Sequence, residues 1–167
     1  MDPFDFGTLH DTLGRTVARW GNRPAYAVSP MPGRAYHPEG KEYTWRQTAD
    51  AVEALRRRYA DAGYGLGHRV AVLFAQRPEF FFHHYALNAL GCSVVPINPD
   101  HRQDEIAYVL EHAEASLALA VDDRLDGLRA VARSLGNGLP VASFDDPAAR
   151  LPEARTRAAE GRPDGAT

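Results

Sequence analysis

The chain has 167 residues, of which 44% are hydrophobic and 25% charged, and its net charge at pH 7 is -3. These values are typical of a folded domain with its own core and exclude disordered, collagen-like and coiled-coil chains. The small, dispersed charge gives no reason to expect nucleic acid or an anionic membrane as a partner. No basic segment followed by an apolar core opens the chain, so we expect a cytoplasmic protein.

Two short strands are the first predicted elements. Residues 25–28 and 41–44 are strand-like, and the Pro- and Gly-rich segment 29–40 between them predicts a hairpin. Thr44-Trp45-Arg46-Gln47 matches a helix-capping box, so a helix is predicted to begin there. Its apolar stripe consists of Thr48, Val52, Leu55, Tyr59 and Ala62. The arginines at 56–58 are expected on its solvated face.

A strand, a helix and a second strand follow. Segment 63–68, Gly-Tyr-Gly-Leu-Gly-His, predicts a turn, and the β-branched run at 69–75 predicts a buried parallel strand. A helix is predicted over 78–90, because Pro78 suits a first turn and the segment is apolar nearly all round. The next buried strand runs from Cys92 to Ile97, which completes a right-handed βαβ unit.

The alternation continues towards the end of the chain. Helices are predicted over 103–115 and 124–136, and strands over 116–121 and 140–144. Strands separated by helices predict a three-layer α/β domain with mainly parallel strands, preceded by the short hairpin.

The composition changes after residue 144. Leu151 is the only strongly apolar residue from Asp145 to Thr167. We therefore predict an α/β subdomain over 1–144 and a polar linker over 145–167. The linker has no structured end, so the chain is expected to be part of a longer protein.

Glycine motifs give no phosphate site. The glycines at 63, 65 and 67 precede a strand, whereas a dinucleotide fingerprint needs them after a strand, at a helix N-terminus. We expect them to serve the turn only. No G-x-x-x-x-G-K-[ST] loop occurs, and Lys41, the sole lysine, has no glycine-rich neighbourhood. No G-x-S-x-G elbow occurs, so a serine hydrolase would lack its nucleophile.

Histidine and cysteine give no metal or catalytic pattern either. The seven histidines lack the Cys or carboxylate spacing of a zinc site. His84 and Asn88 lie four residues apart and are candidates for a buried polar pair with a packing role rather than a catalytic one. Cys92 lies in an apolar run and is predicted to be a small buried hydrophobe.

Candidate ligand residues follow from position. In open parallel sheets ligands bind outside the carboxyl ends of the strands, so the loops after residues 75 and 97 are the places to expect them. Their polar residues are Gln76, Arg77, Asn98, Asp100, His101 and Arg102. Arg102 stands where a capping side chain is expected and cannot accept amide hydrogen bonds, which suggests a function. In the alternative interpretation Asp100 caps the helix and Arg102 is merely exposed.

A family resemblance covers most of the chain. Residues 43–120 show, in order, a Thr-aromatic helix start, a G-x-x-x-G-x-R-V-A-V turn and strand, and the segments RPEF, ALNALG, VVPINP and DEIAYVLEHAEA. This order resembles the N-terminal region of adenylate-forming (AMP-binding) enzymes, namely acyl-CoA synthetases, peptide-synthetase adenylation domains and luciferases. The likeness extends over about residues 10–145, and HHYALNALGCSVVPINPDHR is most similar to stand-alone acyl-CoA synthetases.

The resemblance implies a function for a parent protein. Such an enzyme joins a carboxylic acid and ATP into an acyl-adenylate, with Mg²⁺, and then transfers the acyl group to CoA, as in fatty-acid metabolism. The family's phosphate loop with its lysine, its adenine and ribose motifs and its C-terminal catalytic lysine have no counterpart here, and the phosphate loop is expected shortly after Thr167. The chain alone is therefore predicted to be catalytically incompetent, without catalytic or metal-binding residues, and to partner the rest of the same enzyme, including its C-terminal lid.

The resemblance also suggests one ligand contact. In thioester-forming relatives a basic residue near the Asn-Pro loop can lie close to the CoA nucleotide. Asp100 follows Pro99 here, so Arg102 is the candidate CoA contact and Asn98 marks the rim of the site. The alternative is a complete small α/β module for nucleotide binding or protein interaction, without catalysis.

Overall fold

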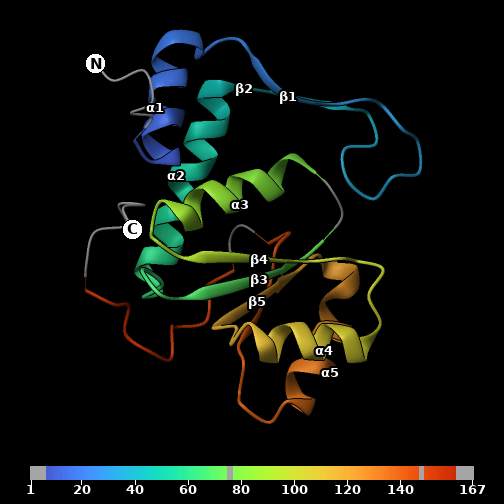
Figure 1. Cartoon of the computed structure of the whole chain (residues 1–167). Helices are drawn as coiled ribbons and strands as arrows, with labels where there is room; N and C mark the ends of the chain where they lie inside the picture. The colour runs from blue at the N-terminus through green and yellow to red at the C-terminus, as the bar shows by residue number, and fades with distance from the viewer. Residues whose placement is uncertain (1–6, 75–76, 147–148, 161–167) are drawn as a thin grey trace.

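A computed structural model describes residues 7–74, 77–146 and 149–160 (Figure 1). Its main sheet has four strands in the order β4-β3-β5-β6, and every neighbouring pair is parallel. The strands are β3 (Arg69–Leu73), β4 (Ser93–Ile97), β5 (Leu117–Ala120) and β6 (Val141–Ser143). The α/β class predicted from the sequence is confirmed.

The predicted hairpin and the helix after it are also confirmed. Strands β1 (Pro24–Val28) and β2 (Lys41–Thr44) pair antiparallel in a separate sheet. Helix α2 (Trp45–Asp61) begins directly after Thr44, whose side-chain oxygen accepts a hydrogen bond from the Gln47 amide at 3.2 Å. The Gln47 side chain accepts one from the Thr44 amide at 2.9 Å, which completes the capping box.

Helix α1 (Leu9–Trp20) has no counterpart among the predicted elements. It begins at a capping box in which Asp11 takes the place of the usual Glu or Gln, and the Thr8 amide donates to Asp11 at 2.9 Å. Leu13 is its only fully buried residue, and Val17 packs against the same core. Leu9, Leu13 and Val17 recur every four residues, so the helical pattern was present in the sequence but was missed.

Helices cover both faces of the main sheet, as the three-layer prediction requires. Figure 1 shows α3 (Pro78–Asn88) on one side of the strands, and α4 (Gln103–His112) and α5 (Asp122–Ser134) on the other. Side chains alternate along β3: Val70 and Val72 belong to the core shared with α2 and α3, while Ala71 and Leu73 belong to the core shared with α4 and α5. Every residue of β5 is buried, which explains the uninterrupted apolar sequence of the strands.

Several helix boundaries differ from the prediction: α3 ends at Asn88 rather than 90, and α5 at Ser134 rather than 136. Helix α4 ends at His112 rather than 115, because Glu114 adopts a left-handed backbone with φ of 48°. Helix α5 begins at Asp122 rather than 124, because the carboxylate of Asp145 accepts the Asp122 amide at 3.1 Å. A cap supplied from a distant residue carries no local sequence signal.

We expect Leu119→Ala to lower the free energy of unfolding by about 2–5 kcal/mol, because it removes a fully buried side chain from the central region of the sheet. Urea denaturation measures the change. Leu9→Ala, at a leucine that is 39% exposed, is the matched control and should lose far less. Equal losses would contradict the assignment of the core to the sheet.

Candidate functional site

The connections of β3 and β5 leave the main sheet in opposite directions. β3 continues into α3 on one face, and β5 continues into α5 on the other, although the two strands are neighbours. In open parallel sheets such a switch in direction creates a crevice at the carboxyl ends of the strands. This carboxyl edge is the candidate site.

Arg77 lies at the centre of the carboxyl edge. Its side chain is only 13% exposed, and it donates to Glu79 at 2.9 Å and to Asp145 at 2.8 Å. The guanidinium also lies over the rings of Tyr36 and Phe144, 5.0 and 5.1 Å from their centroids. One cation therefore joins the start of α3, the hairpin loop and the segment after β6.

Glu79 completes this cluster from the side of the hairpin. Besides Arg77, it accepts hydrogen bonds from the Tyr43 hydroxyl at 2.8 Å and from His37 Nε2 at 2.6 Å. Burial alone would raise the pKa of Glu79, but the hydrogen bonds from Arg77, His37 and Tyr43 outweigh it and lower the pKa to about 2. The carboxylate is therefore ionised at neutral pH and fully engaged.

Asp145 connects the cluster to α5. One of its oxygens pairs with Arg77 and the other accepts the amide of Asp122, so a single carboxylate neutralises the cation and caps the helix. Across the part of the chain that the structure describes, no group of three or more His, Cys, Asp and Glu is placed to hold a metal ion. Through Arg77, Glu79 and Asp145, these interactions connect the hairpin, α3 and α5.

His83 lies buried beneath the same edge. Burial lowers its pKa to about 3, so the ring is neutral and its Nδ1 accepts from the Tyr59 hydroxyl at 2.6 Å. The ring also stacks on Phe144 with centroids 4.2 Å apart. Its burial and its contacts with Tyr59 and Phe144 make His83 a packing residue.

The predicted polar pair of His84 and Asn88 is wrong. Asn88 is exposed, and the buried Nδ1 of His84 has no hydrogen-bond partner among the described residues. The His84 ring instead stacks on Phe80, 6.1 Å away, because helical side chains lean towards the N-terminus of their helix.

Cys92 is buried, as predicted. It is 4% exposed, its Sγ lies 3.2 Å from the carbonyl oxygen of Gly65, and burial raises the pKa of the thiol to about 12. A thiol with so high a pKa stays protonated at neutral pH and is a poor nucleophile.

The loop after β4 is held by its own hydrogen bonds, separate from the cluster around Arg77. The side-chain oxygen of Asn98 accepts the Asp100 amide at 3.0 Å, and the guanidinium of Arg124 donates to the carbonyl of Pro99. Arg102, not Asp100, occupies the N-cap of α4, and its amide donates to Glu105 at 2.7 Å. The alternative of an Asp100 cap is therefore wrong, because Glu105 reaches back to the first turn and Asp100 lies two residues too early.

The candidate residues from the sequence thus fall into separate groups. Arg77 belongs to the cluster with Glu79, whereas residues 98–102 surround the end of β4, and Gln76 lies outside the described residues. His101 keeps a buried Nδ1 without a hydrogen-bond partner in the described segments. Sequence reasoning missed His37 and Tyr43, which join Glu79 from 42 and 36 residues away, a separation at which no motif spacing applies.

Comparison with protein families gives one clear match. A model of the AMP-binding enzyme family matches residues 13–164. The chain is 28% identical over 151 residues to the sulfoacetate--CoA ligase of Cupriavidus necator, an overlap that covers 90% of this chain and 28% of that ligase. It is 29% identical over 135 residues to the 2,3-dihydroxybenzoate-AMP ligase of Bacillus subtilis, covering 80% of this chain and 23% of that ligase. The chain thus spans about a quarter of the length of these relatives.

Solved structures show the same fold. One described as a long-chain-fatty-acid CoA ligase from Rhodopseudomonas palustris superposes with a TM-score of 0.72 at 26% identity, over 93% of this chain and 39% of that one. The N-terminal subdomain of NpsA from Klebsiella oxytoca superposes with a TM-score of 0.63 at 22% identity, over 82% of this chain and 31% of that one.

We expect Glu79→Gln to remove roughly 3 kcal/mol of stability at neutral pH, since its pKa falls from 4.5 to about 2 on folding. An acid whose pKa is lowered stabilises the fold above its unfolded pKa. The contribution is therefore complete above about pH 4.5 and is lost as the pH falls towards 2. Urea denaturation between pH 2 and 7 should show this slope in the parent chain and a shallower one in the variant.

The matched control is Glu153→Gln, at a carboxylate that pairs with Arg150 but is 74% exposed, and which should leave stability and its pH dependence nearly unchanged. Identical pH slopes in the parent chain and Glu79→Gln would show that Glu79 does not hold the cluster together.

Proposed function

Because the chain belongs to the AMP-binding enzyme family, we propose that it forms the N-terminal part of an ATP-dependent acyl-CoA ligase. Such a ligase joins a carboxylic acid to ATP, releases pyrophosphate and passes the acyl group from the adenylate to the thiol of CoA. The observation that carries the proposal is the family match over residues 13–164, in a chain that spans only 28% of the sulfoacetate--CoA ligase. We also propose that the enzyme is cytoplasmic.

The residues that the structure describes do not fit ATP and Mg²⁺. Two carboxylates at the carboxyl edge, Glu79 and Asp145, already neutralise Arg77. Stabilising a transferred adenylyl group needs several cations and donors aimed at the phosphates. The proposal therefore assigns ATP and metal binding to other parts of the parent enzyme, and the chain alone is proposed to be inactive.

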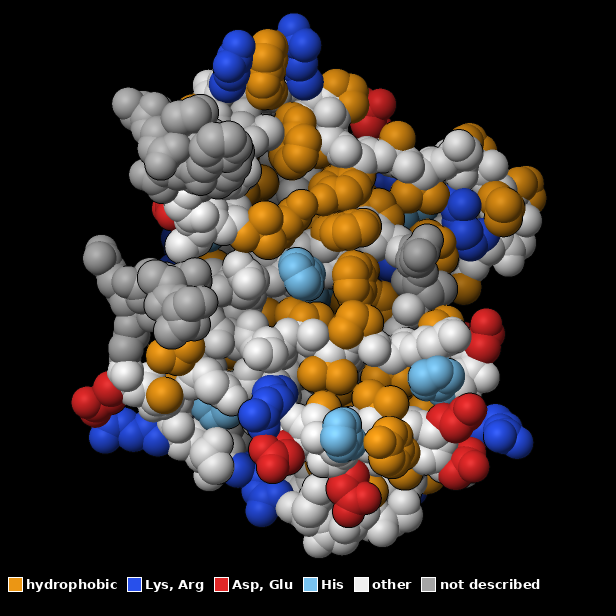
Figure 2. Space-filling model, viewed as in Figure 1, with side chains coloured by type: hydrophobic (Ala, Val, Ile, Leu, Met, Phe, Trp, Pro, Cys, Tyr) orange, Lys and Arg blue, Asp and Glu red, His pale blue; other side chains and the backbone are white. Residues whose placement is uncertain are grey.

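An apolar surface supports the proposal that further parts of the enzyme pack here. Figure 2 shows hydrophobic side chains gathered over the half of the molecule that holds α1 and α3. On these two helices Leu9, Trp20 and Phe81 are 39, 37 and 42% exposed. Hydrophobic side chains gathered on a surface are typical of an interface. We assign this surface to the remainder of the same enzyme.

No helix in the described residues is long and apolar enough to cross a membrane.

Arg102 is the residue proposed to contact CoA. Its side chain is 79% exposed at the start of α4, so its guanidinium is accessible to a nucleotide phosphate. Nε lies 3.7 Å from Glu105 and 4.0 Å from Asp104, so a phosphate would compete with these carboxylates. Asn98, four residues earlier, uses its side-chain oxygen to shape the same loop and marks the rim of the site.

We expect no ATP–pyrophosphate exchange from the 167-residue chain with any member of a panel of carboxylic acids, and exchange from a longer protein that contains it. Radiolabelled pyrophosphate incorporation measures both. Exchange by the 167-residue chain itself would refute the proposed inactivity. In the gene, a Ser/Thr/Gly-rich loop with a lysine soon after Thr167 supports the ligase, whereas a stop codon favours a small non-catalytic module.

In the longer protein, Arg102→Ala should raise the KM for CoA roughly tenfold and leave the KM for ATP nearly unchanged, because one charge-assisted contact to a phosphate is lost. Arg150→Ala is the matched control, since Arg150 is also exposed and also pairs with a glutamate three residues on. Unchanged CoA kinetics in Arg102→Ala would remove Arg102 from the site.

A further inference from the structure

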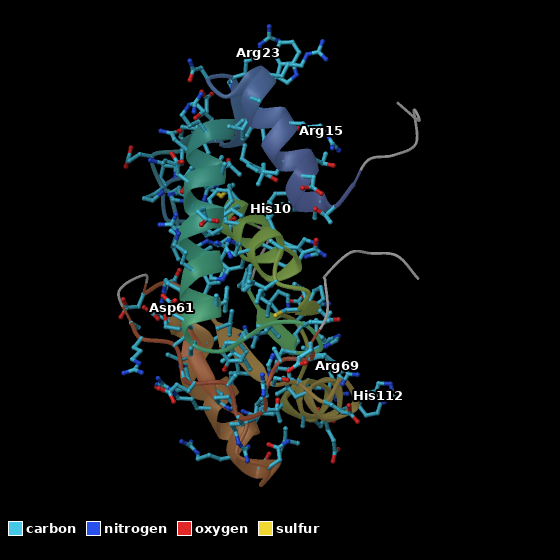
Figure 3. The ribbon with its side chains drawn as sticks, turned by 90° about the vertical axis from the view of Figure 1, so that its left-hand side faces the viewer. His10, Arg15, Arg23, Asp61, Arg69 and His112 are labelled. Carbon is cyan, nitrogen blue, oxygen red and sulfur yellow. The ribbon has the colours of Figure 1, made fainter. Side chains whose placement is uncertain are left out.

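Residues 149–160 run along the amino-terminal side of the main sheet, beside the turn that joins α2 to β3. In Figure 1 this segment lies below the end of α2, and Figure 3 labels Asp61 and Arg69, which flank the turn. Two amides of the segment donate to carbonyls at this turn: Ala154 to Ala62 at 2.8 Å, and Ala159 to Leu66 at 2.9 Å. We call residues 149–160 the strap and residues 62–68 its seat.

Small side chains of the strap face the glycines of the seat. A Cβ atom built at Gly65 would lie 3.0 Å from the Cβ of Ala158, and one built at Gly63 would lie 3.5 Å from the Cβ of Ala154. Gly63 needs glycine for its backbone, with φ of 86°, whereas Gly65 has no such positive φ. The interpretation of these glycines as serving the turn only is therefore wrong for Gly65, whose missing side chain makes room for the strap.

His68 supplies a polar link between the two. It is 3% exposed, its Nδ1 lies 3.0 Å from the Gly65 amide nitrogen, and its Nε2 lies 3.1 Å from the carbonyl oxygen of Thr156. A neutral ring that carries its proton on Nε2 satisfies both contacts. One buried imidazole thus bridges seat and strap.

Two further contacts fix the start of the strap. Leu151 is 7% exposed and belongs to the core on the α2 and α3 face of the sheet. Arg58, expected on the solvated face of α2, instead donates to the carbonyl of Ala149 at 2.6 Å. The ion pairs Arg150–Glu153 and Arg157–Glu160 lie within the strap and are largely exposed, so they add little to its attachment.

We propose that the strap docks on its seat as one cooperative unit and opens separately from the core. Its attachment comprises one apolar anchor, two backbone hydrogen bonds to the seat, the His68 bridge, a close fit of alanine on glycine, and hydrogen bonds from Arg58 to Ala149 and from Arg155 to the carbonyl of Asn137. Segments held by so few buried contacts open at a lower free energy than the core. The segment predicted as a polar linker therefore includes the strap, whose contacts with the seat fix the path of the chain at the amino-terminal ends of the strands.

Hydrogen exchange and trypsin cleavage after Arg155 test the proposal in the full chain. Gly65→Ala places a methyl group against Ala158 and should weaken the docking of the strap. The amides of Ala154 and Ala159 should then exchange roughly tenfold faster, and trypsin cleavage should accelerate. Exchange of the Leu119 amide in β5 should not change. The double variant Gly65→Ala/Ala158→Gly removes the clash and should restore both rates.

Gly14→Ala is the control, because nothing lies within 4 Å of a Cβ at that position. Leu151→Ala tests the strap without altering the seat and should accelerate exchange at Ala154 in the same way. The proposal is overturned if Ala154 and Ala159 exchange at the rate of Leu119 in the parent chain, if Gly65→Ala leaves their exchange unchanged, or if Ala158→Gly fails to restore it.

Discussion

The guanidinium of Arg77 is a buried cation, and a buried cation has to be neutralised and hydrogen-bonded where it lies. Glu79 and Asp145 meet this requirement from two different parts of the chain, and the guanidinium also lies over the rings of Tyr36 and Phe144. The hairpin, α3 and the start of α5 take their relative positions from this requirement. The same carboxylates are thereby unavailable for binding a metal ion.

Different interactions stabilise the structure at the two ends of the strands. Charge and directional hydrogen bonds organise the carboxyl edge around Arg77, whereas close packing of small side chains attaches the strap at the amino edge around Gly65. Both arrangements hold the scaffold together. That division agrees with a chain that belongs to the AMP-binding enzyme family but spans about a quarter of the relatives compared with it.

Predictions from the sequence succeeded where the determining interaction is local. A few neighbouring residues are enough to predict each of these features: the capping box at Thr44, the apolar stripe of α2 and the uninterrupted apolar strands. They failed where the partner is distant: the cap of α5 comes from Asp145, and the ring of His84 meets Phe80 rather than Asn88. Helix α1 was missed although its signal is local too, because Leu9, Leu13 and Val17 recur every four residues after the capping box at Thr8.

The α/β class, the order of the elements after α1, the burial of Cys92 and, through the order of the motifs, the family resemblance could all be predicted from the sequence. These follow from periodicity, turn residues and local hydrogen bonding, which depend on neighbours along the chain. The contacts of His37 and Tyr43 with Glu79, and of Ala158 with Gly65, are visible only in the folded structure. Such contacts join residues tens of positions apart, and they exist only once the sheet and its helices have brought those residues together.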